Sequence, residues 1–249
     1  MNHNSGNRTA LVTGGSRGIG RSISIMLSER YADNIYINYV QNDREAEITK
    51  ELINKSGCKA ALLKFNLAYP DEIDKMFECI YSESAAIDIF VHCAAINSFK
   101  PVTAITPKQW DLIMNVNARS FLYCAQKCLP VMNKGNIVAI SSLGSRKYLA
   151  NYGSLSETKS ALETLVRDLG VELAGKGVRV NGVTAGLVQT ESLKNFPGYQ
   201  ELITAAKVKT PLGRIGTPED IANAVDFLIG GKSDWITGQN IVVDGGISL

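Results

Sequence analysis

The 249-residue sequence lacks several features that mark particular classes of protein. No apolar run reaches the roughly 18–20 residues that a membrane-spanning helix needs, so we expect no membrane partner. Lys and Arg total 26 against 24 Asp and Glu, and this balance gives no reason to expect a nucleic-acid partner. Residues 1–8 are polar and have no apolar signal core, which predicts a cytoplasmic protein.

Cysteine is scarce and scattered. The five cysteines form an odd set, and the two that stand four residues apart, Cys124 and Cys128, have no His or Cys partners that would complete a zinc pattern. We therefore expect no metal site. Buried free thiols in a reducing compartment are the predicted state of these residues.

Apolar strand-like runs alternate with longer helical patterns along the whole chain, with no internal repeat or linker. This alternation predicts one α/β domain over residues 1–249, a Rossmann-type doubly wound parallel sheet of about seven strands with helices on both faces. Residues 185–216 are rich in glycine and proline, and we expect a substrate-binding insert there. The expected strands are 9–13, 34–39, 60–65, 87–92, 136–141, 179–183 and 240–243, and the expected helices are 18–31, 44–55, 71–83, 107–132, 152–174, 191–206 and 218–230.

A glycine-rich turn, TGGSRGIG at residues 13–20, joins the first expected strand to the first expected helix. Small residues let a backbone approach a pyrophosphate, and a helix N-terminus offers free N–H groups and the positive end of its dipole. The turn therefore predicts a dinucleotide site, against the alternative of a glycine turn without a ligand. The expected cofactor contacts in the turn are Gly14, Ser16, Arg17, Gly18, Ile19 and Gly20.

The end of the second strand indicates which dinucleotide is bound. An acidic residue there would bind the ribose 2′-hydroxyl of NAD and repel the 2′-phosphate of NADP. Asn38 stands at this end, and the first acid after it is Asp43. Arg17 could pair with a 2′-phosphate through charge-assisted hydrogen bonds. We therefore expect NADP(H), with Asn38 and Arg17 among the residues that bind it.

The TGxxxGxG spacing of this turn resembles that of the short-chain dehydrogenase/reductase family, whose reductive site uses Ser, Tyr and Lys. Ser142 ends an expected strand, and Tyr152 and Lys159 follow on the expected helix 152–174. The family tyrosine normally stands four residues before the lysine, where this chain has Leu155. At about 100° per residue, spacings of four and seven both leave two residues on one helix face. We expect the Lys159 ammonium to favour the Tyr152 phenolate and lower its pKa.

The spacing of seven between Tyr152 and Lys159 resembles that of the enoyl-[acyl-carrier-protein] reductase branch of the family, and the NADPH-dependent type III in particular. The resemblance implies reduction of the 2,3 double bond of a trans-2-enoyl thioester in fatty acid biosynthesis, with acyl carrier protein as partner and a homotetrameric state. A 3-oxoacyl thioester reductase is the nearest alternative, followed by a polyol or sugar dehydrogenase. A non-catalytic nucleotide sensor is disfavoured by the Tyr–Lys pair. Further segments similar to this branch lie at residues 115–118, 140–145, 196–197 and 242–246.

The resemblance also assigns roles outside this pair. In the family an asparagine at the position of Asn117 supports the lysine through water, and the lysine itself binds the nicotinamide ribose. Cys93 stands where the family has asparagine, and His92 beside it is expected to be structural. The remaining expected cofactor contacts are Asn66 and Leu67 at the adenine, Cys93, Ala94 and Ala95 at its ribose, and Val188 and Thr190 at the carboxamide. The candidates to meet an acidic carrier protein, against the favoured alternative of ordinary solvated charges, are Arg146, Lys147, Lys194, Lys207, Lys209 and Arg214.

Overall fold

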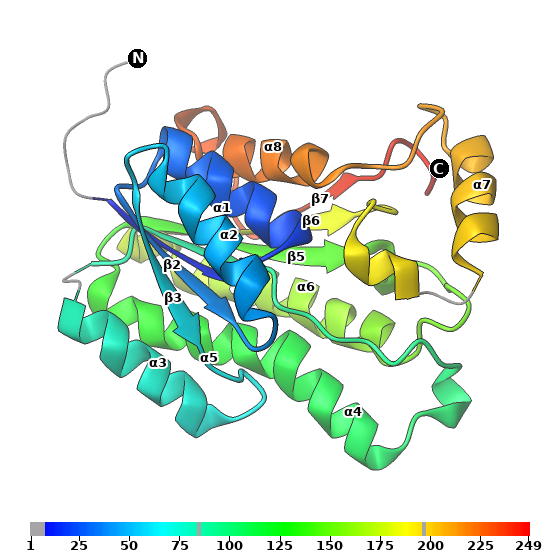
Figure 1. Ribbon diagram of the computed structural model, residues 1–249, viewed down its shortest axis with the longest axis horizontal. Helices are drawn as coiled ribbons and strands as arrows, with labels where there is room; N and C mark the ends of the chain where they lie inside the picture. The colour runs from blue at the N-terminus through cyan, green and yellow to red at the C-terminus, as the bar shows by residue number, and fades with distance from the viewer. Residues whose placement is uncertain (1–7, 84–85, 196–197) are drawn as a thin grey trace.

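The computed structural model describes residues 8–83, 86–195 and 198–249, and a parallel sheet forms its centre (Figure 1). The strand order is β3-β2-β1-β4-β5-β6-β7, so the order reverses between β1 and β4, and the predicted fold class is confirmed. The strands are β1 Thr9–Thr13, β2 Asn34–Tyr39, β3 Lys59–Lys64, β4 Ile89–His92, β5 Gly135–Ser142, β6 Val178–Ala185 and β7 Asn240–Val243.

Helices cover both faces of the sheet. In Figure 1, α1, α2 and α8 lie above the sheet and α3 to α6 lie below it, while α7 stands beyond the carboxyl ends of β5 and β6. The helices are α1 Gly18–Arg30, α2 Asp43–Asn54, α3 Pro70–Glu83, α4 Pro107–Met114, α5 Ser120–Cys128, α6 Leu155–Glu172, α7 Tyr199–Lys209 and α8 Pro218–Ile229, with a π-helical segment at Asn115–Arg119. None of the helices described here combines the length and apolarity that crossing a membrane requires.

Two hydrophobic cores lie on opposite faces of the sheet, because successive strand side chains point to opposite faces. Ile137 and Ala139 of β5 pack into the core beneath α3, α5 and α6, while Val138 and Ile140 pack into the core with α1 and α8. The alternation continues beyond the apolar run, and it places Ser141 of β5 on the same face as Ile137 and Ala139. This face is the one that α6 covers.

The carboxyl ends of the central strands meet at one edge of the sheet. Thr13 of β1 is in register with His92 of β4, and Ser142 of β5 is in register with Ala185 of β6. In doubly wound folds ligands bind at this edge, close to the point where the strand order reverses. The glycine turn and the expected catalytic residues therefore lie at the position where the fold class places a site.

Three expected helices differ from the structure. Residues 107–132 form α4 and α5 separated by the π-helical segment, rather than one helix. The expected helix 191–206 is wrong, because Glu191–Asn195 is a 3-10 helix and α7 begins only after Gly198, whose φ of 72° lies in the left-handed region. The expected helix 152–174 begins at Leu155, so Tyr152 precedes it. The segment 196–197 that resembles the enoyl reductase branch lies outside the described residues.

The cysteines are free thiols with different surroundings. Cys58, Cys124 and Cys128 are buried, as predicted, and Cys93 is half-buried at the carboxyl edge of the sheet. Cys79 is exposed on α3, so the prediction of a buried thiol is wrong at this position. Among the described residues, no group of three or more His, Cys, Asp or Glu side chains is placed to hold a metal ion.

Candidate active site

The glycine turn leaves the start of α1 open to an anion. Gly14 and Gly18 have φ values of 63° and 54°, a conformation that favours glycine. Arg17 occupies the N-cap position without a side-chain cap bond, and the first turn of α1 holds no acid. The N–H groups at this helix end are therefore available to a negatively charged group.

The turn is fixed to α2 through the Ser16 carbonyl oxygen. The Thr49 hydroxyl donates to this oxygen over 2.7 Å, and the Arg21 Nη2 donates to it over 2.9 Å. Arg21 also pairs with Glu45 of α2 over 2.5 Å. Ser16 itself is buried, whereas Arg17 is exposed and free to meet a phosphate. Sequence reasoning did not single out Arg21 or Thr49, which keep the turn in place.

The segment after β4 packs against the glycine turn. The Cys93 N–H donates to the Thr13 carbonyl oxygen over 3.2 Å. A Cβ built on Gly14 would lie 2.8 Å from the Ala94 Cα, so only glycine admits this approach. Ala94 is half-buried and Ala95 is exposed. The structure thus brings Cys93 and Ala94 to the turn, and their contacts with a cofactor stay a prediction.

His92 is a core residue. Its side chain is fully buried, and its Nδ1 lies 2.9 Å from the Thr13 hydroxyl. Burial, with a contribution from the nearby positive charge of Lys159, lowers the pKa of His92 to about 3. The imidazole is therefore neutral at physiological pH, which agrees with the structural role expected for it.

Two residues expected near the cofactor serve the local backbone. The Asn66 Oδ1 accepts a hydrogen bond from the Ala68 N–H over 3.0 Å, which closes a turn after β3. The Asn38 Nδ2 donates to the carbonyl oxygens of Leu63 and Phe65 over 3.2 and 2.9 Å. Asn38 is 1% exposed, so its side chain joins β2 to β3. Cofactor contacts from Asn38, Asn66 and the buried Leu67 stay predictions.

Of the two residues expected at the carboxamide, Thr190 lies beside the glycine turn. Val188 forms an isolated parallel bridge with Gly216, which fixes the loop after β6. A Cβ built on Gly18 would lie 3.5 Å from the Thr190 Cγ2, so Thr190 is in reach of the turn. Ile19 packs against the core beneath α1 and α8, which leaves its backbone at the helix start. Segments 170 residues apart in sequence thus line one site.

Tyr152 is placed by a turn that precedes α6. Asn151 and Ser154 both have φ values of 57°, outside the helical region, and they flank the turn. The Gly153 N–H donates to the Lys100 carbonyl oxygen over 3.0 Å, and a Cβ on Gly153 would lie 2.6 Å from that oxygen. The prediction that Tyr152 and Lys159 share one face of a helix is therefore wrong, because only Lys159 lies in α6.

The half-buried Tyr152 side chain lies next to Ser142. Burial raises the pKa of Tyr152, and a hydrogen bond with the Ser142 side chain partly offsets the rise. The expectation that Lys159 lowers this pKa is wrong in direction, because loss of solvent around the phenol outweighs the other effects. The phenol therefore keeps its proton at neutral pH and can donate it. The Ser142 Oγ also accepts a hydrogen bond from the Gly144 N–H over 3.3 Å.

Lys159 projects from α6 onto the end of β5. It is 4% exposed, and its Nζ donates to the Ile140 carbonyl oxygen over 2.6 Å. Burial lowers the pKa of Lys159 to about 8, although Cys93 and Glu163 act in the opposite direction. A cation that titrates near neutral pH and lies among candidate catalytic groups is typical of a functional site.

Asn117 joins the loop after β4 to α6. Its Oδ1 accepts from the Ile96 N–H over 2.8 Å, and its Nδ2 donates to the Ile96 carbonyl oxygen over 2.9 Å and to the Thr158 hydroxyl over 3.1 Å. It lies in the π-helical segment, and such segments occur frequently at functional sites. Support of Lys159 through water stays a prediction, but Asn117 does position the residue adjacent to that lysine.

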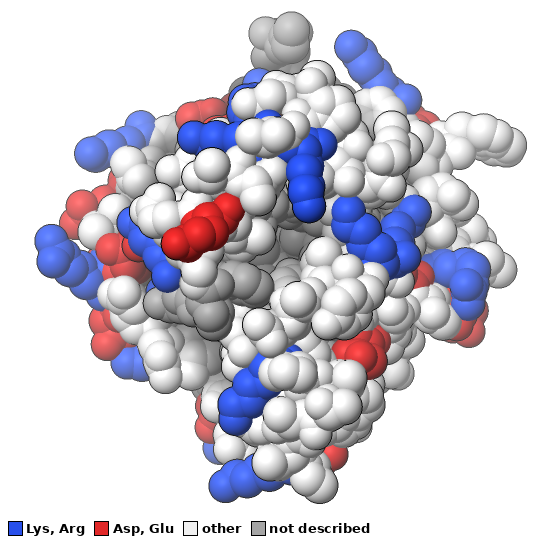
Figure 2. Space-filling model, turned by 90° about the vertical axis from the view of Figure 1, so that its right-hand side faces the viewer, with Lys and Arg blue, Asp and Glu red and all other residues white. Residues whose placement is uncertain are grey.

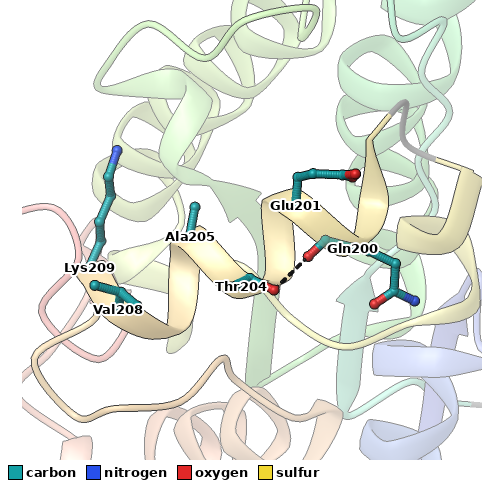
Figure 3. Close-up of a pocket in the computed structure, with 6 residues that line it drawn as sticks. All are labelled: Gln200, Glu201, Thr204, Ala205, Val208 and Lys209. Carbon is teal, nitrogen blue, oxygen red and sulfur yellow. Dashed lines mark hydrogen bonds between the residues drawn. The ribbon is translucent and has the colours of Figure 1, made fainter.

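Two hollows open near this edge of the sheet. One, of about 360 Å³, is lined by Tyr152, Tyr148 and Val102 among others. The second lies along the outer face of α7, where the Thr204 hydroxyl donates to the Gln200 carbonyl oxygen over 2.9 Å (Figure 3). Figure 2 faces this edge and shows Lys and Arg side chains above and beside a central hollow. Only the first hollow reaches a candidate catalytic side chain.

Comparisons with known proteins agree with this arrangement. The sequence model of a family described as Enoyl-(Acyl carrier protein) reductase matches residues 14–248. A short-chain dehydrogenase/reductase from Serratia marcescens superposes with a TM-score of 0.91 and 28% sequence identity, covering 99% of this chain and 100% of that one. The chain belongs to the short-chain dehydrogenase/reductase family. It is therefore an oxidoreductase, and the family implies a nicotinamide cofactor.

The names of two relatives from this family describe different reductions. A 1-cyclohexenylcarbonyl-CoA reductase of Streptomyces collinus is 33% identical over 97% of this chain and 87% of its own length. A 3-oxoacyl-[acyl-carrier-protein] reductase of Staphylococcus epidermidis is 32% identical over 98% of this chain and 100% of its own length. The first name describes a substrate with a double bond next to a thioester, and the second name describes a substrate with a ketone.

The glycine turn fits the dinucleotide that the family implies. A Cβ on Gly20 would lie 2.1 Å from the Gly14 carbonyl oxygen, so the backbone closes tightly under the start of α1. The N-terminus of α1 is open, and Thr190, Cys93 and Ala94 lie next to the turn. The residues present would hold the pyrophosphate at α1 and the nicotinamide end near Lys159 and Thr190.

Proposed function

We propose that the protein is an NADP(H)-dependent reductase of the 2,3 double bond of trans-2-enoyl thioesters. The observation that carries the proposal is the placement of Tyr152 on a turn seven residues before Lys159, half-buried next to Ser142. The description of the matching family and the Streptomyces relative support the same chemistry. The Staphylococcus relative favours a second candidate, reduction of a 3-oxoacyl thioester at the same residues.

The protonation state of Tyr152 supports the reductive direction. When bound, a reduced nicotinamide would supply hydride to the β-carbon of the enoyl group, and the resulting enolate would then take up a proton at the α-carbon. The Tyr152 phenol, protonated because its pKa is raised, donates a hydrogen bond to the thioester oxygen as enolate charge develops there. Lys159 adds positive charge to the same region, and Ser142 orients the phenol. Preplaced donors of this kind supply about 3 kcal/mol of transition-state stabilisation each.

A side-by-side assay separates the two candidate reactions. We expect the purified enzyme to oxidise NADPH with a crotonyl thioester and to turn over an acetoacetyl thioester at least about tenfold more slowly, because the proposed donor geometry serves an enolate oxygen. The reverse preference would replace the proposal by the ketoreductase. Activity on a free polyol, with neither thioester reduced, would exclude both.

The exposed guanidinium of Arg17 predicts a preference for NADPH over NADH. Arg17 lies at the N-cap of α1, and no acid precedes Asp43 after β2. We expect Arg17→Ala to raise the KM for NADPH about tenfold and to change the KM for NADH by less than about twofold, since only NADPH carries the 2′-phosphate. Steady-state kinetics with both cofactors measures this. A wild-type preference for NADH would contradict the assignment.

We propose that an acyl carrier protein, an acidic partner, meets the basic side chains at the carboxyl edge of the sheet (Figure 2). Three of the six candidate cations already have acidic partners within the chain, namely Arg146 with Glu163, Lys194 with Glu191 and Arg214 with Asp220. Lys207 and Lys209 are exposed on the last turn of α7, and Lys209 lines the hollow of Figure 3. These two lysines are the best placed to meet the carrier.

Charge reversal at α7 tests the carrier proposal. We expect Lys207→Glu with Lys209→Glu to lower kcat/KM for a carrier-bound crotonyl thioester about tenfold, because like charges oppose the encounter. The crotonyl thioester of N-acetylcysteamine carries no phosphate, and its turnover should be unchanged. Lys176→Glu is the matched control, since this exposed lysine precedes β6 at the opposite edge of the sheet. Equal turnover of the carrier-bound substrate by all three enzymes would contradict the proposal.

A further inference from the structure

Glu163 of α6 is the centre of a hydrogen-bond cluster that no sequence motif assigns. Its Oε1 accepts from the hydroxyls of Ser141, Ser145 and Thr184 over 2.7, 2.6 and 2.8 Å. Ser141 and Thr184 are register partners near the carboxyl ends of β5 and β6. Ser145 ends the 3-10 helix Leu143–Ser145 that follows β5. One carboxylate oxygen thus holds three separate segments of the chain.

The hydrogen-bond cluster around Glu163 is largely shielded from bulk water. Thr184 is fully buried, Ser141 is 2% exposed, and the Glu163 side chain is 15% exposed. The other oxygen, Oε2, faces Arg146, whose Nε is 3.6 Å away and whose side chain is 44% exposed. An ionised carboxylate only accepts hydrogen bonds, so the Ser141 and Thr184 hydroxyls point their protons at Glu163. The Ser145 hydroxyl lies within bonding distance of both Glu163 and the Ser142 carbonyl oxygen, at 2.6 and 2.8 Å.

The residues that Glu163 holds flank the candidate catalytic groups. Ser142 lies between Ser141 and Ser145 in the chain. Lys159 precedes Glu163 by one helical turn, and its Nζ bonds to Ile140, the residue before Ser141. Helix α6 therefore contacts the end of β5 at two successive positions, once through a cation and once through an anion.

We propose that Glu163 is a positioning residue, which fixes the ends of β5 and β6 against α6 and so places Ser142 for the reductive step. The proposal rests on the proposed function only in assuming that Ser142 orients the reacting phenol. Glu163 does not touch the reacting atoms in this arrangement. A displacement of about 1 Å in a positioning group lowers turnover about a hundredfold, so a residue of this kind affects kcat more than binding.

Isosteric variants test the proposal. We expect Glu163→Leu, which removes all three acceptor contacts, to lower kcat about tenfold to a hundredfold, with the Kd for NADPH changed by less than about twofold. Glu163→Gln keeps an acceptor oxygen and should retain an intermediate kcat. The exposed Glu172, on the same helix, gives the control Glu172→Gln, which should match the wild type.

Two further measurements separate positioning from general support of the fold. Removing the negative charge of Glu163 should shift the alkaline limb of the kcat profile to lower pH, because Glu163 acts to raise the pKa of Lys159. In a double-mutant cycle, Glu163→Gln and Thr184→Val should be non-additive in kcat, since both remove the same contact. Thr184→Val also tests the cluster if Glu163→Leu does not fold.

The outcomes are distinct from those that test the proposed function. A kcat for Glu163→Leu within about twofold of the wild type, or a lower melting temperature with kcat unchanged, would overturn the positioning role. Failure of the wild type to reduce either thioester would instead overturn the proposed function. The Glu163 series would then be measured on whichever alcohol or carbonyl compound the wild type converts.

Discussion

Replacing Tyr152 by phenylalanine is expected to lower kcat by about two to four orders of magnitude, the usual worth of a positioned proton donor. The phenylalanine ring can keep the position of the tyrosine ring, whose Cδ1 lies 2.8 Å from a Cβ built on Gly144. The loss therefore isolates the hydroxyl, which holds its proton at neutral pH. Initial rates of NADPH oxidation with a crotonyl thioester measure the effect.

Cofactor binding provides the internal control for this variant. The glycine turn and Thr190 do not involve Tyr152, so the Kd for NADPH, followed by its fluorescence, should be unchanged within about twofold. Tyr148→Phe is the matched variant, because Tyr148 is 87% exposed and lines the same hollow without lying next to Ser142. Turnover near the wild-type level in Tyr152→Phe would remove this residue from the mechanism.

Activity is expected to fall as the pH rises through about 8, because Lys159 loses its charge there. Below this pH the ammonium is protonated and supports the developing negative charge; above it the neutral amine gives no such support. His92 is neutral throughout this range, since its pKa is lowered to about 3, and the pKa of Tyr152 is raised. When kcat is measured from pH 6 to pH 10 at saturating NADPH, it should therefore fall above about pH 8 by up to about tenfold per pH unit.

The variant Lys159→Arg assigns this limb. A guanidinium stays protonated in the whole range, so the residual rate of the variant should show no limb near pH 8. A wild-type profile that is level to pH 9.5 would mean that the Lys159 charge has no part in the slow step. A limb that persists in Lys159→Arg would assign the titration to another group.

Strand positions were predictable because buried parallel strands are continuous apolar runs. Expected strands at 9–13, 34–39 and 240–243 have the same bounds as β1, β2 and β7. The glycine turn was predictable for a related reason, since positive φ values at Gly14 and Gly18 restrict those positions to glycine. A burial pattern or backbone conformation that only certain residue types tolerate can therefore be recognised in a sequence.

The turn that carries Tyr152 was not predictable, because its left-handed residues are Asn151 and Ser154 rather than glycine. Helical periodicity continues through them, and the start of α6 is decided by the tertiary contact between Gly153 and Lys100. The π-helical segment at Asn115–Arg119 was not predicted either.

Side-chain roles that depend on orientation were also beyond the sequence. Asn38 stands where the sequence predicts a cofactor contact, yet its amide bonds to the backbone of β3. Glu163 occupies an inward position of α6 four residues after Lys159, and a carboxylate at such a position needs partners. This unusual position was visible in the sequence. The three hydroxyls that bond to Glu163, however, belong to residues up to 22 positions away, and only the fold brings them together.

The order of the strands bears on how the chain folds during synthesis. β4 returns to pair with β1, and from β5 onward each strand adds to the edge of the strand completed before it, since β5 pairs with β4, β6 with β5 and β7 with β6 (Figure 1). The sheet can therefore grow in the order in which the ribosome delivers it, as expected for domains that fold from the N-terminus. Until β6 emerges, β5 is an open edge that can pair with another chain, so a pause in translation after β5 has left the ribosome and before β6 follows would expose the nascent protein to aggregation.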